Sequence, residues 1–458
     1  MTESAQPSDL NVPELLQALA GFADLEQQTL HHKESRAFIL YIRSLCDPAF
    51  VSGRLVAPFY ELGGGEAYAK YLEGCPGRQE AANTQAALAL LLRGYLLIQT
   101  EEGRFTLVDA LKVQASPVGE TSDENIVQGP SDSLTEALEV NLNLIRRRYQ
   151  SAHLKLETVI LGSLSQTKTA ILYDESRVDQ TVLAELKRRL DGIKVGKVEV
   201  LQAAGELERL LSEDPLRIFP LLVVSERPDR LVLGLSEGKI VILLDTTGYG
   251  ILLPSTSNDF LTAMDDKYQM PVVGLFLRLL RYIGVAITLW LPALYVAFTS
   301  YNPEIVRIQI ALLIAGSRAT VPYPAFVEVL LMLLMMEFLV EASLRLPKAI
   351  GPAATTVGGL ILGQAATAAG LVGNIMIILV SAVAISNFMI PLNMMSFTVR
   401  VLKYFFLALC AMFGVVGLVM GLVGMVMYMS HLRSFGKPYM RLYLIRNIRR
   451  TFKRARGG

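Results

Sequence analysis

Hydrophobic and polar positions divide the chain into two parts that meet near residue 271. Before this point, short apolar runs alternate with stretches whose apolar residues recur every three or four positions. This alternation predicts strands and helices arranged as α/β units. After it, apolar runs of about 20 residues follow one another, the length that a helix needs to cross the core of a bilayer. We therefore expect an α/β region, placed in the cytosol, followed by an all-α multi-span membrane domain.

One pattern occurs twice in the first part: strand, helix, helix, glycine, strand, acidic turn, strand. The first copy comprises residues 36–42, 51–60, 84–93, 94–100 and 104–108. The second comprises residues 170–173 and 180–190, then 219–224 and a helix-like stretch ending at Gly238, and then 239–245 and 250–253. The copies share a pattern and not residue identities, which predicts two related subdomains. The expected organisation is an N-terminal α/β subdomain (1–115), a linker with a capped amphipathic helix (116–150), a second α/β subdomain (151–271), a transmembrane domain (272–430) and a basic cytosolic tail (431–458).

The helix expected between the subdomains has a start signal and a basic end. Ser133 followed by Glu136 fits a capping box, in which each side chain accepts the other residue's amide. Leu134, Leu138, Leu142 and Ile145 then share one helical face. The helix would end at Arg146, Arg147 and Arg148, where cations suit a helix C-terminus. A well-capped helix explains this pattern, and the alternative is that the three arginines contact a membrane headgroup or an acidic neighbouring subunit.

Five long apolar runs are candidate spans, and they leave the topology open. They are residues 282–299, 325–340, 353–371, 375–392 and 404–430, and a shorter apolar piece covers 305–316. The polar N-terminus has no features of a signal peptide, so we expect the first half to stay in the cytosol. Nine Lys or Arg residues and no acid follow Ser430, which places the tail in the cytosol by the positive-inside rule. Both ends on one side require an even number of crossings, four or six.

Composition and charge agree with this division. The chain is 52% hydrophobic with a mean hydropathy of +0.41, too high for an ordinary soluble enzyme of 458 residues. The net charge of +1 hides an asymmetry, because 38 of the 42 acidic residues precede residue 272.

No enzyme, metal or cofactor site is expected. The glycine run 63–65 lacks the Lys-Ser/Thr of a P-loop and the spacing of a dinucleotide fingerprint. The three cysteines are scattered, and the four histidines show no metal-ligand spacing. Nothing in the sequence points to nucleic acid either.

The third long run carries a candidate pore face. Thr356, Gly359, Gly363 and Thr367 fall within an arc of about 80° at 100° per residue, with Gln364 at its edge and Leu360 beside it as a candidate constriction. Small residues at this spacing allow close helix packing. The functional alternative is a pore lined by small and polar side chains in an oligomer.

Two further features of the membrane half are open to more than one interpretation. Glu337 and Glu341 lie one helical turn apart and are candidate gating contacts, although pairing with Arg345 would make them structural. The glycines at 414, 417, 421 and 424 also share a face, for which helix packing is preferred.

Several segments resemble the A subunit of spore germinant receptors, the GerA family. They are Gly129-Pro-Ser-Asp-Ser-Leu-Thr-Glu with Leu-Ile-Arg-Arg-Arg to 148, Arg278-Leu-Leu-Arg-Tyr-Ile, Leu291-Pro-Ala-Leu-Tyr-Val-Ala, Val321-Pro-Tyr-Pro-Ala-Phe-Val-Glu, Arg345-Leu-Pro-Lys-Ala-Ile-Gly, Val357-Gly-Gly-Leu-Ile-Leu-Gly-Gln and Leu432-Arg-Ser-Phe-Gly-Lys-Pro-Tyr. They cover residues 129 to about 440 in order. The chain departs from the family at Ser133-Leu134, where an aromatic and a glycine are usual, and at Ser131, where a charged residue is common.

The resemblance implies a multi-pass protein of the spore inner membrane. Its partners would be a transporter-like B subunit that binds the nutrient, a lipoprotein C subunit, membrane lipid and further copies of itself in a pentamer. Such an oligomer is expected to form a nutrient-gated ion channel that releases monovalent cations and starts germination.

Three alternatives remain. They are a paralogous amplifying channel opened by ions, a transporter and a non-conducting signalling scaffold. The segment from Val321 to Glu328 favours the receptor branch. The absence of charge from 350 to 399 is unlike a transporter, which needs paired charges near the bilayer midplane.

Overall fold

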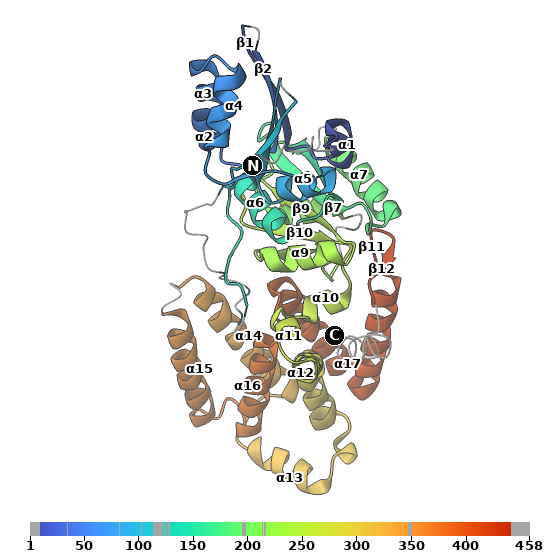
Figure 1. Ribbon diagram of the computed structural model, residues 1–458. Helices are drawn as coiled ribbons and strands as arrows, with labels where there is room; N and C mark the ends of the chain where they lie inside the picture. The colour runs from blue at the N-terminus through green and yellow to red at the C-terminus, as the bar shows by residue number, and fades with distance from the viewer. Residues whose placement is uncertain are drawn as a thin grey trace.

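The computed structural model describes residues 10–440 apart from 34, 82, 102, 113–120, 122–123, 125, 127–128, 195–197, 213, 215–216 and 347–349. An α/β region carries both sheets that the sequence predicts, and a bundle of apolar helices follows it (Figure 1). The tail beyond residue 440 and much of the linker at 116–128 lie outside the described residues.

The first sheet lies between two layers of helices. Its elements are α1 (Val12–Ala18), β1 (Leu25–His32), β2 (Ser35–Ile42), α2 (Pro48–Phe50), the π-helix η1 (Val51–Val56), α3 (Ala57–Glu61), α4 (Gly65–Glu73), β3 (Arg78–Gln79), α5 (Thr84–Leu91), β4 (Tyr95–Thr100) and β5 (Phe105–Asp109). Successive residues of β2 point to opposite faces, as strand geometry requires. Ile39 therefore packs with Phe59 of α3, and Leu40 packs with Leu91 of α5.

The second sheet repeats this plan. It contains β6 (Leu154–Leu161), β7 (Thr167–Asp174), α7 (Gln180–Lys194), α8 (Ala204–Leu211), β8 (Val223–Ser225), α9 (Pro228–Ser236), β9 (Ile240–Leu244) and β10 (Gly250–Leu253). Every residue of β9 is buried, as its unbroken apolar run requires.

The two sheets have the same topology. Their strand orders are β1-β2-β4-β5-β3 and β6-β7-β9-β10-β8, and the pairings are antiparallel in both. The expected fold class, a region of two related α/β subdomains followed by a helical region, is confirmed.

Helix α6 (Leu138–Arg148) joins the subdomains, but its start differs from the prediction. The helix begins after Ala137, and the Ser133 hydroxyl donates to the carbonyl of Leu134. The capping box is therefore wrong. The Leu138 amide instead donates to Asp245 at 3.1 Å, and the Asn141 side chain bonds both the amide and the carbonyl of Thr135. The cap comes from a residue 107 positions away, because α6 packs on the second sheet.

The α/β region ends with two short helices, α10 (Ser257–Leu261) and α11 (Asp265–Tyr268). The helical region contains α12 (Pro271–Ser300), the short 3₁₀ helix η2 (Pro303–Ile305), α13 (Ile308–Ser317), α14 (Ala325–Leu344), α15 (Gly351–Ala368), α16 (Asn374–Phe388) and α17 (Asn393–His431), and it closes with the hairpin of β11 (Arg433–Ser434) and β12 (Lys437–Pro438). Among the described residues, two helices, α12 and α17, are long and apolar enough to cross a membrane.

Helix α17 folds back on itself at Gly414. The backbone there has φ of 59° and ψ of −140°, outside the helical range. A Cβ on Gly417 would lie 2.2 Å from the carbonyl oxygen of Leu409, and one on Gly421 would lie 2.9 Å from the Phe406 ring. In a continuous helix, Gly417 and Leu409 would be about 12 Å apart along the axis. The prediction of one continuous span over 404–430 is wrong, because residues 393–413 and 415–431 form two antiparallel legs.

This fold-back gives the bundle an even number of legs. In the described part of the chain, six helical segments lie between the α/β region and the end of the molecule where α13 is seen in Figure 1. They are α12, α14, α15, α16 and the two legs of α17. Tyr301, at the end of α12, packs against Gly414 at that far end.

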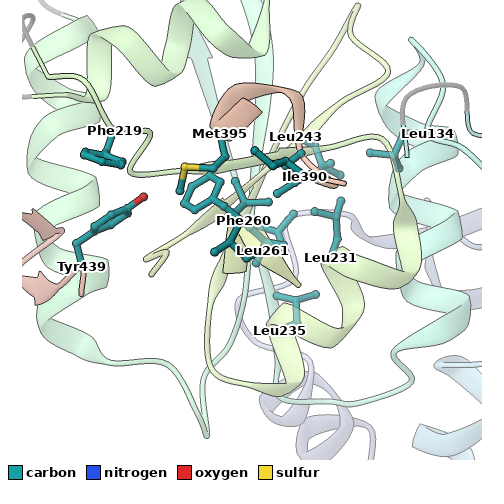
Figure 2. Packing of buried hydrophobic residues seen from close by; sticks show 14 of the residues in the cluster. Leu134, Phe219, Leu231, Leu235, Leu243, Phe260, Leu261, Ile390, Met395 and Tyr439 are labelled. Atoms are coloured by element: carbon teal, nitrogen blue, oxygen red, sulfur yellow. The ribbon is translucent and has the colours of Figure 1, made fainter. Parts of the chain in front are cut away.

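One hydrophobic core extends from the second sheet into the bundle. Figure 2 shows Leu243 of β9, Leu231 of α9 and Phe260 of α10 beside Ile390 and Met395 of the helical region. Tyr439, at the end of the β11–β12 hairpin, is fully buried between Phe219 and Phe260. The two regions therefore share a core.

Candidate functional site

Helix α15, the candidate pore helix, lies at the outside of the bundle. It packs against α14 through Gly358, whose added Cβ would lie 3.1 Å from Leu339, and against α16 through Gly363, which faces Ile377. Val357, Leu360 and Ile361 on its other side are more than half exposed. One face of α15 is therefore uncovered in a single chain.

Some of the predicted pore residues lie on this uncovered face, and others lie at its boundary with α16. Thr356 and Gln364 are exposed, and a side chain at Gly359 would meet nothing within 4 Å. The Thr367 hydroxyl donates to the carbonyls of Gly363 and Gln364, at 3.1 and 2.9 Å, so the helix itself satisfies it. The structure thus brings Thr356, Gly359, Leu360 and Gln364 to open space and turns Gly363 toward α16.

Glu337 and Glu341 have different surroundings. Glu341 is exposed and pairs with Arg345 at 2.8 Å, the structural alternative that the sequence left open. Glu337 is largely buried and binds two cations of the first α17 leg, Arg400 and Lys403. Arg400 and Lys403 were not among the residues predicted from the sequence. Their signal was visible, because they are the first charges after the uncharged stretch and lie three residues apart on one helical face.

The three arginines of α6 also differ from one another. Arg146 is 2% exposed, binds Asp24 at 2.6 Å and lies over the ring of Phe22. Arg148 pairs with Asp132, and Arg147 is exposed. The burial of Arg146 therefore conflicts with a contact between this side chain and a membrane headgroup or a neighbouring subunit. Of the three arginines, Arg147 is the one that is exposed for such a contact.

Ion pairs hold the start of α12 to the α/β region. Asp266 of α11 is buried and lies 2.6 Å from Arg281 and 3.7 Å from Arg278, both on α12. Arg281 also donates to the carbonyl of Leu261, and Arg230 of α9 donates to that of Thr262. These contacts fix the angle at which the first long helix leaves the α/β region.

A loop of the second subdomain contacts both legs of α17. The Ile218 amide donates to the Tyr428 hydroxyl at 3.2 Å, and the Thr398 hydroxyl donates to the Ile218 carbonyl at 3.0 Å. Next to this loop, Arg217 pairs with the buried Glu208 at 2.7 Å. Burial raises the pKa of Glu208 to about 7 against the pull of Arg217. The two contacts of Ile218 were not predicted from the sequence, because they join residues 210 and 180 positions apart.

The described residues hold no group of three or more His, Cys, Asp or Glu side chains arranged for a metal ion. The buried charges described above pair with one another, and the features that remain open are the outer face of α15 and the junction between the two regions.

The chain combines an α/β region of two sheets with a bundle of apolar helices, and it carries the motifs between residues 129 and 440. This combination indicates one protein family. The model of the Bacillus/Clostridium GerA spore germination protein family matches residues 14–456, and the chain belongs to this family. The resemblance of the motifs is thereby confirmed.

The curated relatives include several spore germination proteins. Spore germination protein GerLA of Bacillus cereus is 35% identical over 316 residues, which cover 69% of this chain and 64% of that protein. Spore germination protein KA of Bacillus subtilis is 35% identical over 323 residues, which cover 70% of this chain and 59% of that protein. The matched part spans less than two thirds of both relatives.

The chain is also similar to a solved structure, the N-terminal domain of the A subunit of the Bacillus megaterium spore germinant receptor GerK3. The match has a TM-score of 0.40 and 20% identity, and covers 55% of this chain and 98% of that one.

Proposed function

We propose that the chain is the A subunit of a spore germinant receptor and that several copies, a pentamer, form an ion channel that releases monovalent cations. The observation that carries this proposal is the uncovered side of α15, an uncharged helix on which Gln364 is exposed and a side chain at Gly359 would meet nothing within 4 Å. Polar groups in a membrane require a partner or a water-filled cavity. Copies arranged around these faces would provide the cavity.

The six legs of the bundle are proposed as six membrane crossings. At 1.5 Å per residue, α12 is about 45 Å long and the α17 legs are about 31 and 26 Å, against a hydrocarbon core of about 30 Å. Helix α16 is shorter, about 22 Å, and lies between α12 and α14. An even number of crossings agrees with the basic tail and the α/β region both lying in the cytosol, inside the spore inner membrane.

Gating is proposed to pass through partner subunits. A transporter-like B subunit would bind the nutrient, a lipoprotein C subunit would complete the receptor, and Arg147 on α6 is available for a subunit contact. The junctions at Asp266 and Ile218 would carry a movement of the α/β region to α12 and to both legs of α17. The released ions would pass along α15, with Leu360 at the constriction.

The substitution Gly359→Trp tests the pore. Nothing lies within 4 Å of an added Cβ at this position, so a single chain accommodates the new side chain, whereas an oligomer would have it in the channel. Ile361→Trp is the matched control, because Ile361 is 60% exposed on the same helix but outside the predicted arc. Potassium release would be measured in spores that carry this chain as their one A subunit, after nutrient addition.

We expect loss of release in Gly359→Trp and normal release in Ile361→Trp, with equal amounts of chain and partners in the membrane. Equal release in both variants would contradict a pore along α15 and favour the signalling scaffold. Release that requires a second, intact receptor would favour the ion-activated amplifying channel.

A further inference from the structure

The ion cluster between α14 and α17 holds more positive than negative charge. Glu337 is its one carboxylate, and Arg400 and Lys403 both bind it, Lys403 at 2.6 Å. Within the described part of the chain, neither cation contacts another acidic side chain. The nearby Glu341 is occupied by Arg345 on the exposed helix surface. One unit of positive charge is therefore left over inside an apolar bundle.

An unbalanced charge in this position is costly. Lys403 is 5% exposed, and Arg400 and Glu337 are less than one fifth exposed. Removing a charge from water costs several kcal/mol unless an opposite charge compensates it. The cluster is thus suited to an additional anion from outside the chain.

The open side of the cluster shows where an anion can enter. The Arg400 guanidinium lies over the ring of Phe397, which is itself half exposed at the outer surface of the bundle. Arg400 is seven residues into α17, so it lies about 10 Å below the helix start that faces the α/β region. This depth is within reach of lipid headgroups for a long basic side chain.

A small pocket adjoins the same cluster, between α14, α16 and the first leg of α17. Leu333, Val380 and Val383 on its inner side are buried, whereas Phe388 of α16, which also lines it, is 65% exposed. The pocket has a volume of about 20 Å³, enough for one water molecule, so a larger ligand has to lie on the outer surface of the bundle. The exposed rings of Phe388 and Phe397 beside the charged cluster match an acyl chain next to a headgroup.

We propose that Arg400 and Lys403, with Glu337 as their shared partner, bind the phosphate of an anionic phospholipid whose acyl chain lies over Phe388 and Phe397 at the outer surface of the bundle. The planar guanidinium suits phosphate oxygens, and basic pockets between membrane helices on the cytoplasmic side bind anionic headgroups. The proposal rests on the proposed membrane location of the bundle. The lipid would hold α14, α16 and the first leg of α17 together beside α15.

The test uses the full-length chain purified in a neutral detergent. Thermal unfolding would be followed after adding phosphatidylglycerol, phosphatidylcholine or inorganic phosphate, and bound lipid would be counted by native mass spectrometry. Arg400→Leu is the test variant, because it leaves Glu337 and Lys403 as a balanced pair. Arg345→Leu is the matched control, since it removes a cation from an exposed pair near the end of α14.

We expect the wild-type chain and Arg345→Leu to bind phosphatidylglycerol at least about tenfold more tightly than phosphatidylcholine, and Arg400→Leu to lose that preference. Equal binding of both lipids by the wild-type chain overturns the proposal, even where a variant fails to fold. Stabilisation by inorganic phosphate equal to that by phosphatidylglycerol also overturns it and indicates a free-anion site. A chain that stays soluble and does not enter vesicles contradicts the membrane location, and with it the proposed function. A chain that inserts without a lipid preference contradicts only the lipid site.

Discussion

Breaking the buried ion pair between Asp24 and Arg146 is expected to loosen the first subdomain from the second. Asp24 precedes β1, and Arg146 lies on α6, which packs on the second sheet. The Asp24 carboxylate accepts from Arg146 at 2.6 Å and from the Ser44 hydroxyl at 2.5 Å, and both charged side chains are less than 5% exposed. In Asp24→Asn the arginine charge stays buried without its counter-ion.

The size of the effect follows from this burial. Removing one partner of a buried pair costs about 3–5 kcal/mol, whereas an exposed pair contributes about 0–1 kcal/mol. The Phe22 ring, 4.3 Å from the Arg146 guanidinium carbon, keeps part of the stabilisation. We therefore take the lower value of about 3 kcal/mol, which corresponds to roughly a 100-fold change in the opening equilibrium.

Hydrogen exchange of the full-length chain in detergent measures this opening locally. We expect amides of β1 and α6 to exchange roughly 100-fold faster in Asp24→Asn, with α12 unchanged. Glu26→Gln is the control, because it removes the exposed partner of Arg43 on the same sheet. The double substitution Asp24→Asn with Arg146→Met should recover much of the protection, since no buried charge is left unpaired. Exchange in Asp24→Asn no faster than in the control would refute the reasoning.

Two further predictions concern the junction and the fold-back. Because burial raises the pKa of Glu208 to about 7 from its ordinary value of 4.5, the folded chain keeps this proton to a higher pH than the unfolded chain. The free energy of unfolding should fall by on the order of 3 kcal/mol as pH rises from 4.5 to 7 and then level off. Thermal unfolding measured over this pH range should show a weaker dependence of stability on pH for Glu208→Gln. An identical pH dependence in the variant would contradict the role of Glu208. Gly417→Leu should prevent the α17 legs from packing, because the side chain would collide with the Leu409 carbonyl, whereas Gly424→Leu has nothing within 4 Å and should be tolerated. Comparing the melting temperatures of these two variants checks this, and equal values would contradict the antiparallel arrangement.

The sequence predicts the α/β region well because burial dominates its strands. Segments such as β9 and β4 are apolar enough to be recognised alone, and the repeated order of elements predicted the second sheet from the first. The edge strands β1 and β6 were missed. Both lie at the end of their sheets, so part of each strand faces solvent, and polar residues interrupt the apolar pattern that identifies a strand.

The missed features of the helical region share a different cause. Gly414 stands in an unbroken apolar run, so hydropathy shows no turn there, and the turn becomes visible in the backbone angles of Gly414 and in the approach of Gly417 to Leu409. The partners of Glu337 lie 63 and 66 residues away, and the cap of α6 comes from Asp245. Such long-range partners depend on tertiary packing, which the spacing of residues along one segment does not encode.

The fold-back at Gly414 also determines the electrostatic field that the backbone creates along the bundle. Each helix carries about half a positive charge at its N-terminus and half a negative charge at its C-terminus. Helices α12 and α15 and the segment 393–413 point away from the α/β region, while α14, α16 and the segment 415–431 point toward it. Three helix dipoles therefore oppose three others, and a single unbroken α17 would have left this balance uneven. Opposed in this way, the dipoles leave the bundle little net backbone field along its axis.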